Sequence, residues 1–499
     1  MIEQSTPTSI TTGDCVLNHR HLLICLLLGS LFAASCASAP RETGTLRRLT
    51  ILHTNDEHGW MDSYKGSGGA DGLKRRWVRS EGWTPDGAYL VISSGDMWSG
   101  PAISTTLAGE SMVNVMNALG YRSATLGNHD FDFGQEAIRQ RRQEANFPFL
   151  GANIRLRSNG ARPDYVDPYA LIDVNGIRVG ILGVTTVETP FDTRPTNVAD
   201  LEFRPYKESL ETYVPEMRAA GADLIVVAGH ICGSEMETLA EPAAALGVSL
   251  IAGGHCHEEI QETVAGVTLI ESGSFLTGYT RVDLLVDTAE DRVVDVQTEY
   301  KSNRRGAADP DMASRIASWA LKLPPEMLEP LGYVREGIDR ESAAMRRLLL
   351  QAWLDADPQA DIALASARYV QQDLLPGVVS EATVIGMLPT RNTLMRIKLT
   401  GEQLEQVVET NRPLVAGLTE TADGYHLADG SPLDLQATYE VLLPDTLYQG
   451  GNYYDVARFD SSPTATGIDW RAPTLALLRA LGTDRSRPLD QVLAGTAAP

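Results

Sequence analysis

Side chains that ligate metals recur at five points along this chain, each directly after a short apolar run. The five stretches are Asp56-Glu57-His58, Gly95-Asp96, Gly127-Asn128-His129-Asp130, Gly229-His230 and Gly254-His255-Cys256-His257. Carboxylate and amide oxygens combined with imidazole nitrogens suit borderline divalent ions such as Mn, Zn, Co or Fe, rather than calcium or a thiolate-bound structural zinc. The pattern therefore predicts a catalytic metal site.

The apolar runs that precede these ligands predict buried β-strands. Residues 49–52, 89–92, 224–227 and 248–251 are short, continuous and rich in β-branched side chains, which is typical of strands covered on both faces. The carboxyl ends of parallel strands meet at one crevice of an open α/β sheet, so ligands far apart in sequence are expected to converge there. Each motif alone is more typical of a turn or a core hydrogen bond, but five in order favour a shared site.

With these motifs, residues 48 to about 300 resemble the calcineurin-like metallophosphoesterases, and more narrowly the 5'-nucleotidase family of secreted two-domain enzymes. The resemblance implies an α/β fold, in which a four-layer calcineurin-like metallophosphoesterase sandwich is followed by a second, α+β substrate domain of the 5'-nucleotidase type. It also implies a metal-dependent phosphoric ester hydrolase.

The same resemblance implies a role for each ligand of a pair of divalent ions. One ion would be held by Asp56, His58, Asp96 and His257, and the other by Asp96, Asn128, His230 and His255. The catalytic His of the family follows the Asn ligand, and an acid three residues later orients it. Here these residues are His129 and Asp132.

Physical chemistry agrees with that assignment. Two cations about 3.5–4 Å apart lower the pKa of a bridging water, so that a hydroxide can attack phosphorus in line at neutral pH. Asp96 would keep the spacing and offset the positive charge. With Asn128 as a ligand, His129 is free to stabilise the developing charge or to protonate the leaving oxygen, and Asp132 would fix its tautomer.

Two cysteines fall among the predicted ligands: Cys232 follows His230 closely, and Cys256 lies between His255 and His257. The ligand set is complete without thiolates, so we favour simple packing over a metal or redox role. A Cys232–Cys256 disulfide is left open, because both loops approach one crevice and an oxidising compartment would permit it.

The composition favours a large secreted globular protein. A length of 499 residues with 43% hydrophobic content is enough for two domains with their own cores. The net charge of −23, from 42 Lys and Arg against 65 Asp and Glu, disfavours binding to duplex DNA or RNA. An anionic substrate must then be attracted locally by the metals.

The N-terminal region predicts export. A 13-residue apolar run, Leu22 to Ala34, is shorter than the roughly 20 residues of a membrane span and fits the core of a secretory signal. Ala33-Ala34-Ser35-Cys36 resembles a bacterial lipobox, which implies a signal peptide over 1–36, a tether over 37–47 and a lipid anchor on Cys36. The expected location is the periplasm or cell surface. The alternative is cleavage after Ala37 or Ala39 and a soluble exported protein.

Later segments mark the domain boundary. Runs at 281–287 and 292–297 predict a hairpin that closes the first domain, which spans 48–300. Residues 301–335 predict a linker that contains a helix from Asp311 to about Leu323, and 336–499 is the expected second domain.

The second domain resembles the substrate domain of the family mainly through Leu388–Leu394, Leu399–Leu404 and Gly450–Tyr454. Where the family has an Asn-Gly-Gly-Ile-Arg type of loop, this chain has Ser366–Gln371. Candidate substrate contacts are the cations and aromatic rings Arg368, Arg391, Tyr453 and Tyr454. Arginines could meet a phosphate and a tyrosine could stack on a base, although packing or solvation of these side chains is the competing interpretation.

The favoured function is an exported two-metal phosphoesterase that hydrolyses nucleotides by in-line attack of a metal-bridging hydroxide. One alternative is a phosphoesterase for a cyclic nucleotide, a nucleotide sugar, a non-nucleotide ester or a related sulfur ester. Another is a surface lipoprotein that binds ligands and keeps the metals as structure, which His129 and Asp132 disfavour because neither is needed to hold the fold. If the second domain holds the substrate, the lobes must close on it.

Overall fold

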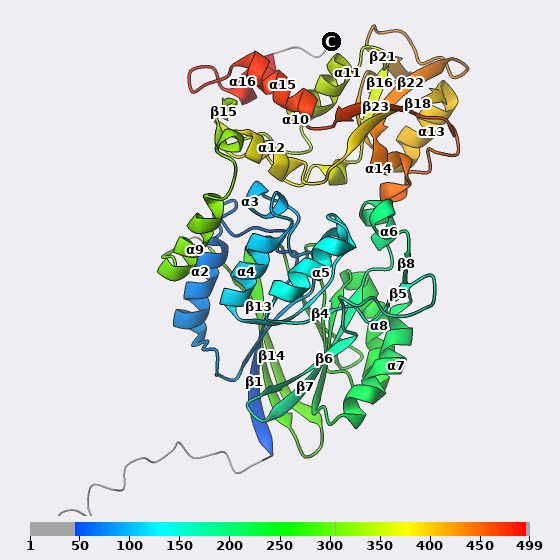
Figure 1. Cartoon of the computed structure of the whole chain (residues 1–499). Coiled ribbons are helices and arrows are strands. Elements are labelled where there is room, and N and C mark those ends of the chain that lie inside the picture. The colour runs from blue at the N-terminus through cyan, green and yellow to red at the C-terminus, as the bar shows by residue number, and fades with distance from the viewer. Residues whose placement is uncertain (1–44, 305, 496–499) are drawn as a thin grey trace, which may run out of the picture. The chain divides into compact units, whose positions relative to one another are not determined.

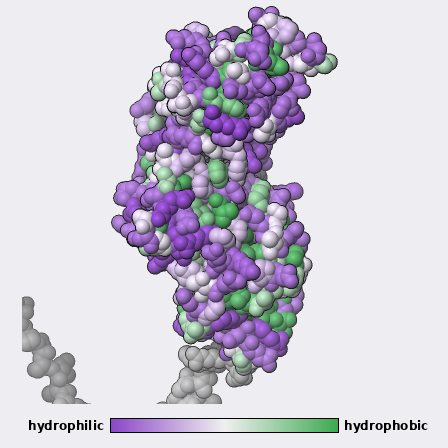
Figure 2. Space-filling model, turned by 90° about the vertical axis from the view of Figure 1, so that its right-hand side faces the viewer, coloured by the Kyte–Doolittle hydropathy of each residue, from purple (hydrophilic) through white to green (hydrophobic). Residues whose placement is uncertain are grey.

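The computed structural model describes residues 45–304 and 306–495. The predicted signal peptide and Cys36 lie outside these residues. From Leu46 onward the described chain forms one compact unit. Within the described residues, no helix has both the length and the apolar character needed to span a membrane. The face drawn in Figure 2 is mostly hydrophilic, with hydrophobic residues scattered among polar ones.

Two six-stranded sheets form the centre of the first domain. The first sheet has the order β14-β13-β1-β2-β3-β4, with β1 (Leu46–Thr54), β2 (Tyr89–Ser93), β3 (Tyr121–Thr125), β4 (Phe149–Leu150), β13 (Gly278–Asp287) and β14 (Arg292–Ser302). The second has the order β11-β12-β10-β9-β7-β6, with β6 (Tyr169–Val174), β7 (Ile177–Thr185), β9 (Leu224–His230), β10 (Leu250–Ala252), β11 (Glu259–Val264) and β12 (Val267–Ser272). The four predicted strands correspond to β1, β2, β9 and β10, and the predicted hairpin is β13 with β14.

Apolar side chains from both sheets meet between them, which explains why these strands read as continuous apolar runs. Leu49 and Ile51 of β1 share a buried cluster with Val226 of β9 and Leu250 of β10. Strands β1 to β4 pair in parallel, as do β7, β9, β10 and β12. The carboxyl ends of these strands therefore lie at the same edge of both sheets.

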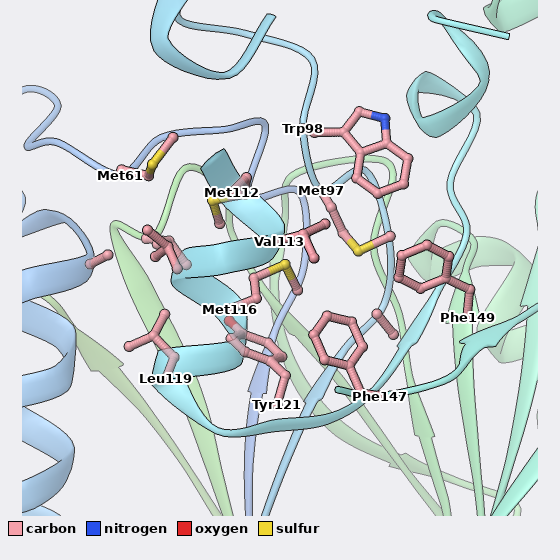
Figure 3. Close-up of a cluster of buried hydrophobic side chains, with 14 of the residues drawn as sticks. Met61, Met97, Trp98, Met112, Val113, Met116, Leu119, Tyr121, Phe147 and Phe149 are labelled. Carbon is pink, nitrogen blue, oxygen red and sulfur yellow. The ribbon is translucent and has the colours of Figure 1, made fainter. Parts of the chain in front are cut away.

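Helices cover the outer face of each sheet, so the first domain has four layers (Figure 1). On the first sheet lie α2 (Gly69–Arg76), α4 (Glu110–Leu119), α5 (Gln135–Glu144) and α9 (Pro310–Ala320), and on the second lie α7 (Tyr206–Ala219) and α8 (Gly233–Ala245). Figure 3 shows Met116 of α4 on the side of Phe147, and Met112 of the same helix on the side of Met61, all in one buried cluster. The predicted four-layer calcineurin-like sandwich is confirmed.

The predicted linker contributes to this core. Helix α9 covers most of the predicted helix and buries Met312, Ile316 and Trp319 in the cluster that also holds residues of α2 and α4. The chain between α9 and the second domain passes through a short 3₁₀ turn at Pro325–Leu328 and β15 (Gly332–Val334).

The second domain is built on a mixed sheet of five strands. Their order is β19-β16-β22-β18-β23, with β16 (Ile362–Ala365), β18 (Thr393–Thr400), β19 (Leu414–Ala416), β22 (Thr438–Pro444) and β23 (Thr464–Asp469). One face packs on helices that include α11 (Ala352–Ala356), α12 (Glu381–Met387) and α15 (Ala472–Leu481), where Trp353 and Trp470 are fully buried. The other face packs on α13 (Gly401–Asn411). This is the expected α+β architecture.

Candidate metal centre

The predicted ligands converge into two clusters at the carboxyl ends of the parallel strands. One cluster contains Asp56, His58 and His257, and the other contains Asp96, His230 and His255; within each, the ligand atoms lie within 4.8 Å of one another. Asp56 and His58 follow β1, Asp96 follows β2, His230 ends β9, and the last two histidines follow β10. Both sheets therefore supply both clusters.

Asp96 lies between the two clusters. Its Oδ2 is 3.2 Å from Nε2 of His230 and 3.7 Å from Nε2 of His58. A carboxylate in this position can share its oxygens between two cations, which is the bridging role expected from the sequence.

The hydrogen bonding of Asp56 indicates whether the clusters fit metal ions. Its Oδ2 accepts hydrogen bonds from the Asn55 side chain at 2.6 Å and from the His255 backbone N–H at 2.9 Å. Its Oδ1 is buried, has no hydrogen-bond donor and faces His257 Nε2 at 3.3 Å. A buried carboxylate oxygen without a donor is costly unless a cation satisfies it. The residues present therefore fit a metal ion.

Asn128 adds an oxygen to the second cluster. Its Nδ2 donates to the carbonyl of Asp192 at 2.9 Å, which leaves Oδ1 directed at Nε2 of His230, 3.1 Å away. The backbone before Asn128 can lie this close to Asp96 because residue 127 is a glycine. A Cβ at Gly127 would lie 2.1 Å from Asp96 Oδ1.

The backbone at the ligands is strained. Positive φ angles occur at Asp56 (50°), His58 (45°), Asp96 (58°), His255 (77°) and His257 (59°). Non-glycine residues adopt this region rarely, and such strain concentrates at functional sites. Backbone hydrogen bonds stabilise part of this strained backbone. Two of them run from Asp56 N–H to Gly95 O and from His58 N–H to Asp96 O, both at 2.8 Å.

The electrostatics of the clusters follow from burial and from Asp96. Burial lowers the pKa of His58 to about 4 and that of His255 to about 3. Burial also opposes the charge of His230, but the carboxylate of Asp96 outweighs it and raises the pKa of His230 to about 10. Burial would raise the pKa of Asp96, yet His230 and His129 hold it well below its usual value. Neutral imidazoles and ionised carboxylates are the forms that bind metals, so His58, His255 and Asp96 are already in the binding form, whereas a bound cation would displace the proton of His230.

His129 lies at the edge of the centre and begins a 3₁₀ turn, His129–Phe131, which Asp132 directly follows. Nδ1 of His129 lies 2.8 Å from Asp132 Oδ2, and its backbone N–H donates to Asp96 Oδ1 at 2.8 Å. Asp132 is fixed in turn by the hydroxyls of Ser99 at 2.7 Å and Thr193 at 2.9 Å. Burial opposes the charge on His129, but Asp132 and Asp96 raise its pKa to about 10.

Asp130 is a site residue to which the sequence analysis gave no role. Its carboxylate accepts the backbone N–H groups of Asp96, Met97 and Gly127 at 3.0, 2.8 and 2.8 Å. It thereby joins the loop after β2 to the loop after β3. In the sequence, the feature that could have pointed to Asp130 is its position at the end of the Gly127–Asp130 motif.

Asp192, at the end of the short helix α6 (Thr189–Asp192), connects the centre to the second domain. Its Oδ2 lies 3.7 Å from His255 Nε2, and its Oδ1 lies 3.4 Å from the guanidinium of Arg368. Arg368, a predicted substrate contact, is thus close to the metal centre and is 69% exposed. Burial raises the pKa of Asp192.

Arg194 makes a further connection that the sequence did not reveal. Its guanidinium lies 3.0 Å from Asp445 Oδ2 and 3.0 Å from Asn392 Oδ1, and it also donates to the carbonyl of Arg391. The side chain of Arg391 itself is exposed. No local sequence pattern marks such a contact.

The two predicted tyrosines have different surroundings. Tyr453 is 48% exposed, stacks on Phe191 of α6 with ring centroids 4.9 Å apart, and donates its hydroxyl to Glu188. Tyr454 is 3% exposed and packs in the core on the α13 side of the sheet. The exposed ring available to a ligand is therefore that of Tyr453.

A cavity of about 660 Å³ opens beside His257. Its walls include Tyr64 and Phe275. Its charged groups have both signs, and they are Lys65, Arg304, Arg340, Asp339, Glu341 and Asp373. A group attached to a phosphate at the metal centre has room in this cavity.

Cys232 and Cys256 form a disulfide, with Cα atoms 5.2 Å apart. The interpretation of these cysteines as simple packing residues is therefore wrong. Their loops follow the neighbouring parallel strands β9 and β10, which brings the two residues within bonding distance.

Comparisons with known proteins agree with this architecture. Residues 334–458 match the family described as 5'-nucleotidase, C-terminal domain, and residues 89–269 match the family of the bacterial capsule synthesis protein PGA_cap. The 5'-nucleotidase of Vibrio cholerae is 30% identical over 262 residues, which cover 48% of this chain and 46% of that protein. The chain thus spans about half the length of this relative.

Other relatives match over more of their length. Protein UshA of Escherichia coli is 25% identical over 519 residues, covering 89% of this chain and 92% of that protein. The structure of a 5'-nucleotidase precursor from Thermus thermophilus superposes with a TM-score of 0.75 at 22% identity, over 88% of this chain and 97% of that chain. A sulfate thiohydrolase, SoxB, from the same organism shares the fold with a TM-score of 0.70 at 17% identity, over 87% and 94%. The chain is thus similar to proteins of the 5'-nucleotidase family in both of its domains.

Proposed function

We propose that this protein is an exported two-metal phosphoesterase that hydrolyses nucleotides. The observation that carries the proposal is the position of Asp96 between two histidine-containing clusters, with His129 at their edge. The similarity to the 5'-nucleotidase of Vibrio cholerae and the match to the 5'-nucleotidase C-terminal domain support a nucleotide substrate.

Each ion would have four protein ligands. One set would be Asp56, His58, Asp96 and His257, and the other would be Asp96, Asn128, His230 and His255. Two bound divalent cations would supply an activated water and would neutralise charge on the phosphoryl oxygens. This donor set accepts Mn, Zn, Co or Fe.

His129 would contribute the general acid. Its Nδ1 is occupied by Asp132, so Nε2 is the nitrogen left to meet the substrate. With Nδ1 paired to Asp132, a proton on Nε2 of His129 would pass to the leaving oxygen as the ester bond breaks. Asp132 holds the ring at the required angle and stabilises its charge.

The second domain would supply the groups that bind the rest of the substrate. Arg368 would meet a phosphate oxygen, which its contact with Asp192 supports, because Asp192 lies 3.7 Å from His255. Tyr453 offers an exposed ring for a nucleobase, and Arg391 an exposed cation. The cavity beside His257 leaves space for a second group on the phosphate.

Export with a lipid anchor on Cys36 completes the proposal and rests on the sequence of the leader. Mass spectrometry of the mature N-terminus distinguishes the possibilities. A diacylated Cys36 supports the anchor, whereas an unmodified terminus at Ser38 or Pro40 supports soluble export.

The proposed activity is tested by phosphate release from the mature protein, reconstituted separately with Mn and Zn. The panel contains nucleoside 5'-monophosphates, ATP, a 2',3'-cyclic nucleotide, a nucleotide sugar and several sugar phosphates. A strong preference for nucleotides supports the proposal. Activity confined to non-nucleotide esters keeps the metal mechanism but overturns the nucleotidase assignment, and no activity with bound metal supports a binding protein.

A further inference from the structure

The disulfide joins the two loops that carry half of the clustered ligands. Cys232 lies two residues after His230, and Cys256 lies between His255 and His257. His230 and His255 belong to one metal cluster and His257 to the other. The disulfide therefore restrains segments that carry ligands of both clusters.

One end of the bond is rigid. Cys232 is the residue before helix α8, and its backbone N–H donates to Glu235 Oε2 at 3.0 Å while its carbonyl accepts the Glu235 N–H at 3.0 Å. Glu235 is fixed further by the hydroxyl of Tyr206 at 2.6 Å. This end follows directly from strand β9, which lies in the middle of its sheet.

The other end is a strained loop. His255 and His257 both have positive φ, and the chain from Cys256 to Glu259 is exposed. Before Cys256, the backbone contacts of this loop are Gly254 N–H to Ile231 O at 3.1 Å and His255 N–H to Asp56 Oδ2 at 2.9 Å. After it, the Glu258 N–H donates to Glu271 Oε1 at 2.8 Å, so Cys256 and His257 themselves lie between these anchors. The disulfide is thus the covalent restraint on the segment that carries the two histidines.

We propose that the Cys232–Cys256 disulfide positions the ligands of the metal centre, and that its reduction weakens metal binding. Strained conformations persist only where the surroundings over-determine them, so release of Cys256 lets His255 and His257 leave the geometry that two ions need. The inference rests on the metal centre of the proposed function.

The chemical step is thiol–disulfide exchange with a small-molecule thiol. Two thiol molecules break the protein S–S bond and form one S–S bond between themselves, and two electrons and two protons pass to the sulfurs of Cys232 and Cys256. The exposure of Cys256 makes this exchange accessible. Under the proposed export, the reducing cytosol would keep the loop open, and the centre would reach full affinity for metal after the chain leaves it.

Metal affinity without substrate is the direct test. Metal-free wild-type protein, oxidised or reduced and desalted anaerobically, is titrated with Mn²⁺, and the free ion is followed by electron paramagnetic resonance. The variants C232S, C256S and the double variant are titrated in the same way. We expect at least a tenfold weaker Kd for one or both ions in the reduced protein and in all three variants. Reoxidation of the wild type should restore the original value.

The variants also separate positioning from loss of folding. Because either substitution removes the same bond, the single and double variants should weaken binding equally, and saturating Mn²⁺ should restore activity while the ligands remain intact. Wild-type affinity in the reduced protein and the double variant would overturn the proposal. The proposal would also be overturned if the reduced wild type bound Co²⁺ more tightly and showed a thiolate-to-cobalt absorption band. The cysteines would then be metal ligands. Oxidised protein that binds no metal would overturn it together with the centre, whereas bound metal without nucleotide hydrolysis would overturn only the substrate assignment.

Discussion

Nδ1 of His129 lies 2.8 Å from Oδ2 of Asp132, three residues later on the same turn. The backbone N–H of His129 also donates to Asp96, the carboxylate between the two clusters. His129 and the predicted bridge, Asp96, are therefore held together by a hydrogen bond between the loop after β3 and the loop after β2.

His129→Ala should remove the general acid without removing a ligand. We expect kcat to fall by about 10²–10⁴-fold, with a smaller change in KM and an unchanged metal content. Steady-state kinetics and elemental analysis of the same preparation check both parts. Asp132→Asn is the matched control, because it keeps a hydrogen bond to the ring but loses the charge, and it should lower kcat by less. A kcat within threefold of wild type in His129→Ala would exclude the proposed acid.

Asp96→Asn should lose metal from both positions, because one carboxylate serves both clusters. His58→Ala should mainly empty the position that contains Asp56 and His257. Inductively coupled plasma mass spectrometry of the two purified variants gives the number of ions per chain. Two ions retained by Asp96→Asn would contradict the bridging role.

The convergence of the ligands was predictable because it depends on short-range patterns. Apolar runs predict the buried strands, and the ends of parallel strands place Asp96 and His230 together without further information. Asn128 gained its role from the family resemblance, and the contact of its Oδ1 with His230 agrees with that role.

Other features of the site depend on packing between segments far apart in sequence. Arg194 meets Asp445 and Asn392 in the second domain, and Phe191 meets Tyr453, although no periodicity links these positions. The positive φ angles at the ligands could not be predicted from the sequence either, because glycine is the residue that usually indicates such a backbone and these residues are not glycine. Adjacent tyrosines Tyr453 and Tyr454 read alike in the sequence, yet the turn of the chain exposes one and buries the other.

Tyr453→Ala should distinguish nucleotides from other substrates. Stacking of a base on an aromatic side chain contributes about 1–3 kcal/mol, so kcat/KM for a nucleoside monophosphate should fall by roughly 5- to 150-fold. Hydrolysis of glycerol phosphate, which has no ring to stack, should be unchanged. The Phe191→Ala variant tests whether the neighbouring ring only supports Tyr453.

Arg412→Ala is a control for the loss of a surface side chain in the second domain, because Arg412 is 69% exposed and pairs with Glu409. Equal losses with the nucleotide and glycerol phosphate in Tyr453→Ala would argue against base stacking and for a structural effect.

Glu81→Gln should destabilise the first domain in a pH-dependent way. The Glu81 side chain is 2% exposed and accepts from Tyr279 at 2.5 Å and Arg281 at 2.6 Å, and Lys301 lies 3.2 Å away. Burial alone would raise the pKa of Glu81, but these three donors lower it below its usual value. The ionised form therefore stabilises the fold above the pKa of an unfolded Glu, and this contribution is lost as the pH falls through the lower pKa of the folded state.

At neutral pH the substitution should lower the free energy of unfolding by about 2 kcal/mol, because two cations lose their buried partner. The difference between the variant and wild type should shrink as the pH falls through the lowered pKa of folded Glu81, because the carboxyl is then protonated in both states. Chemical denaturation of metal-free protein across this pH range measures it, with Glu290→Gln at the exposed Arg292 pair as a control that should change stability little. A difference that is the same at every pH would mean that the charge of Glu81 contributes nothing and that its shape alone matters.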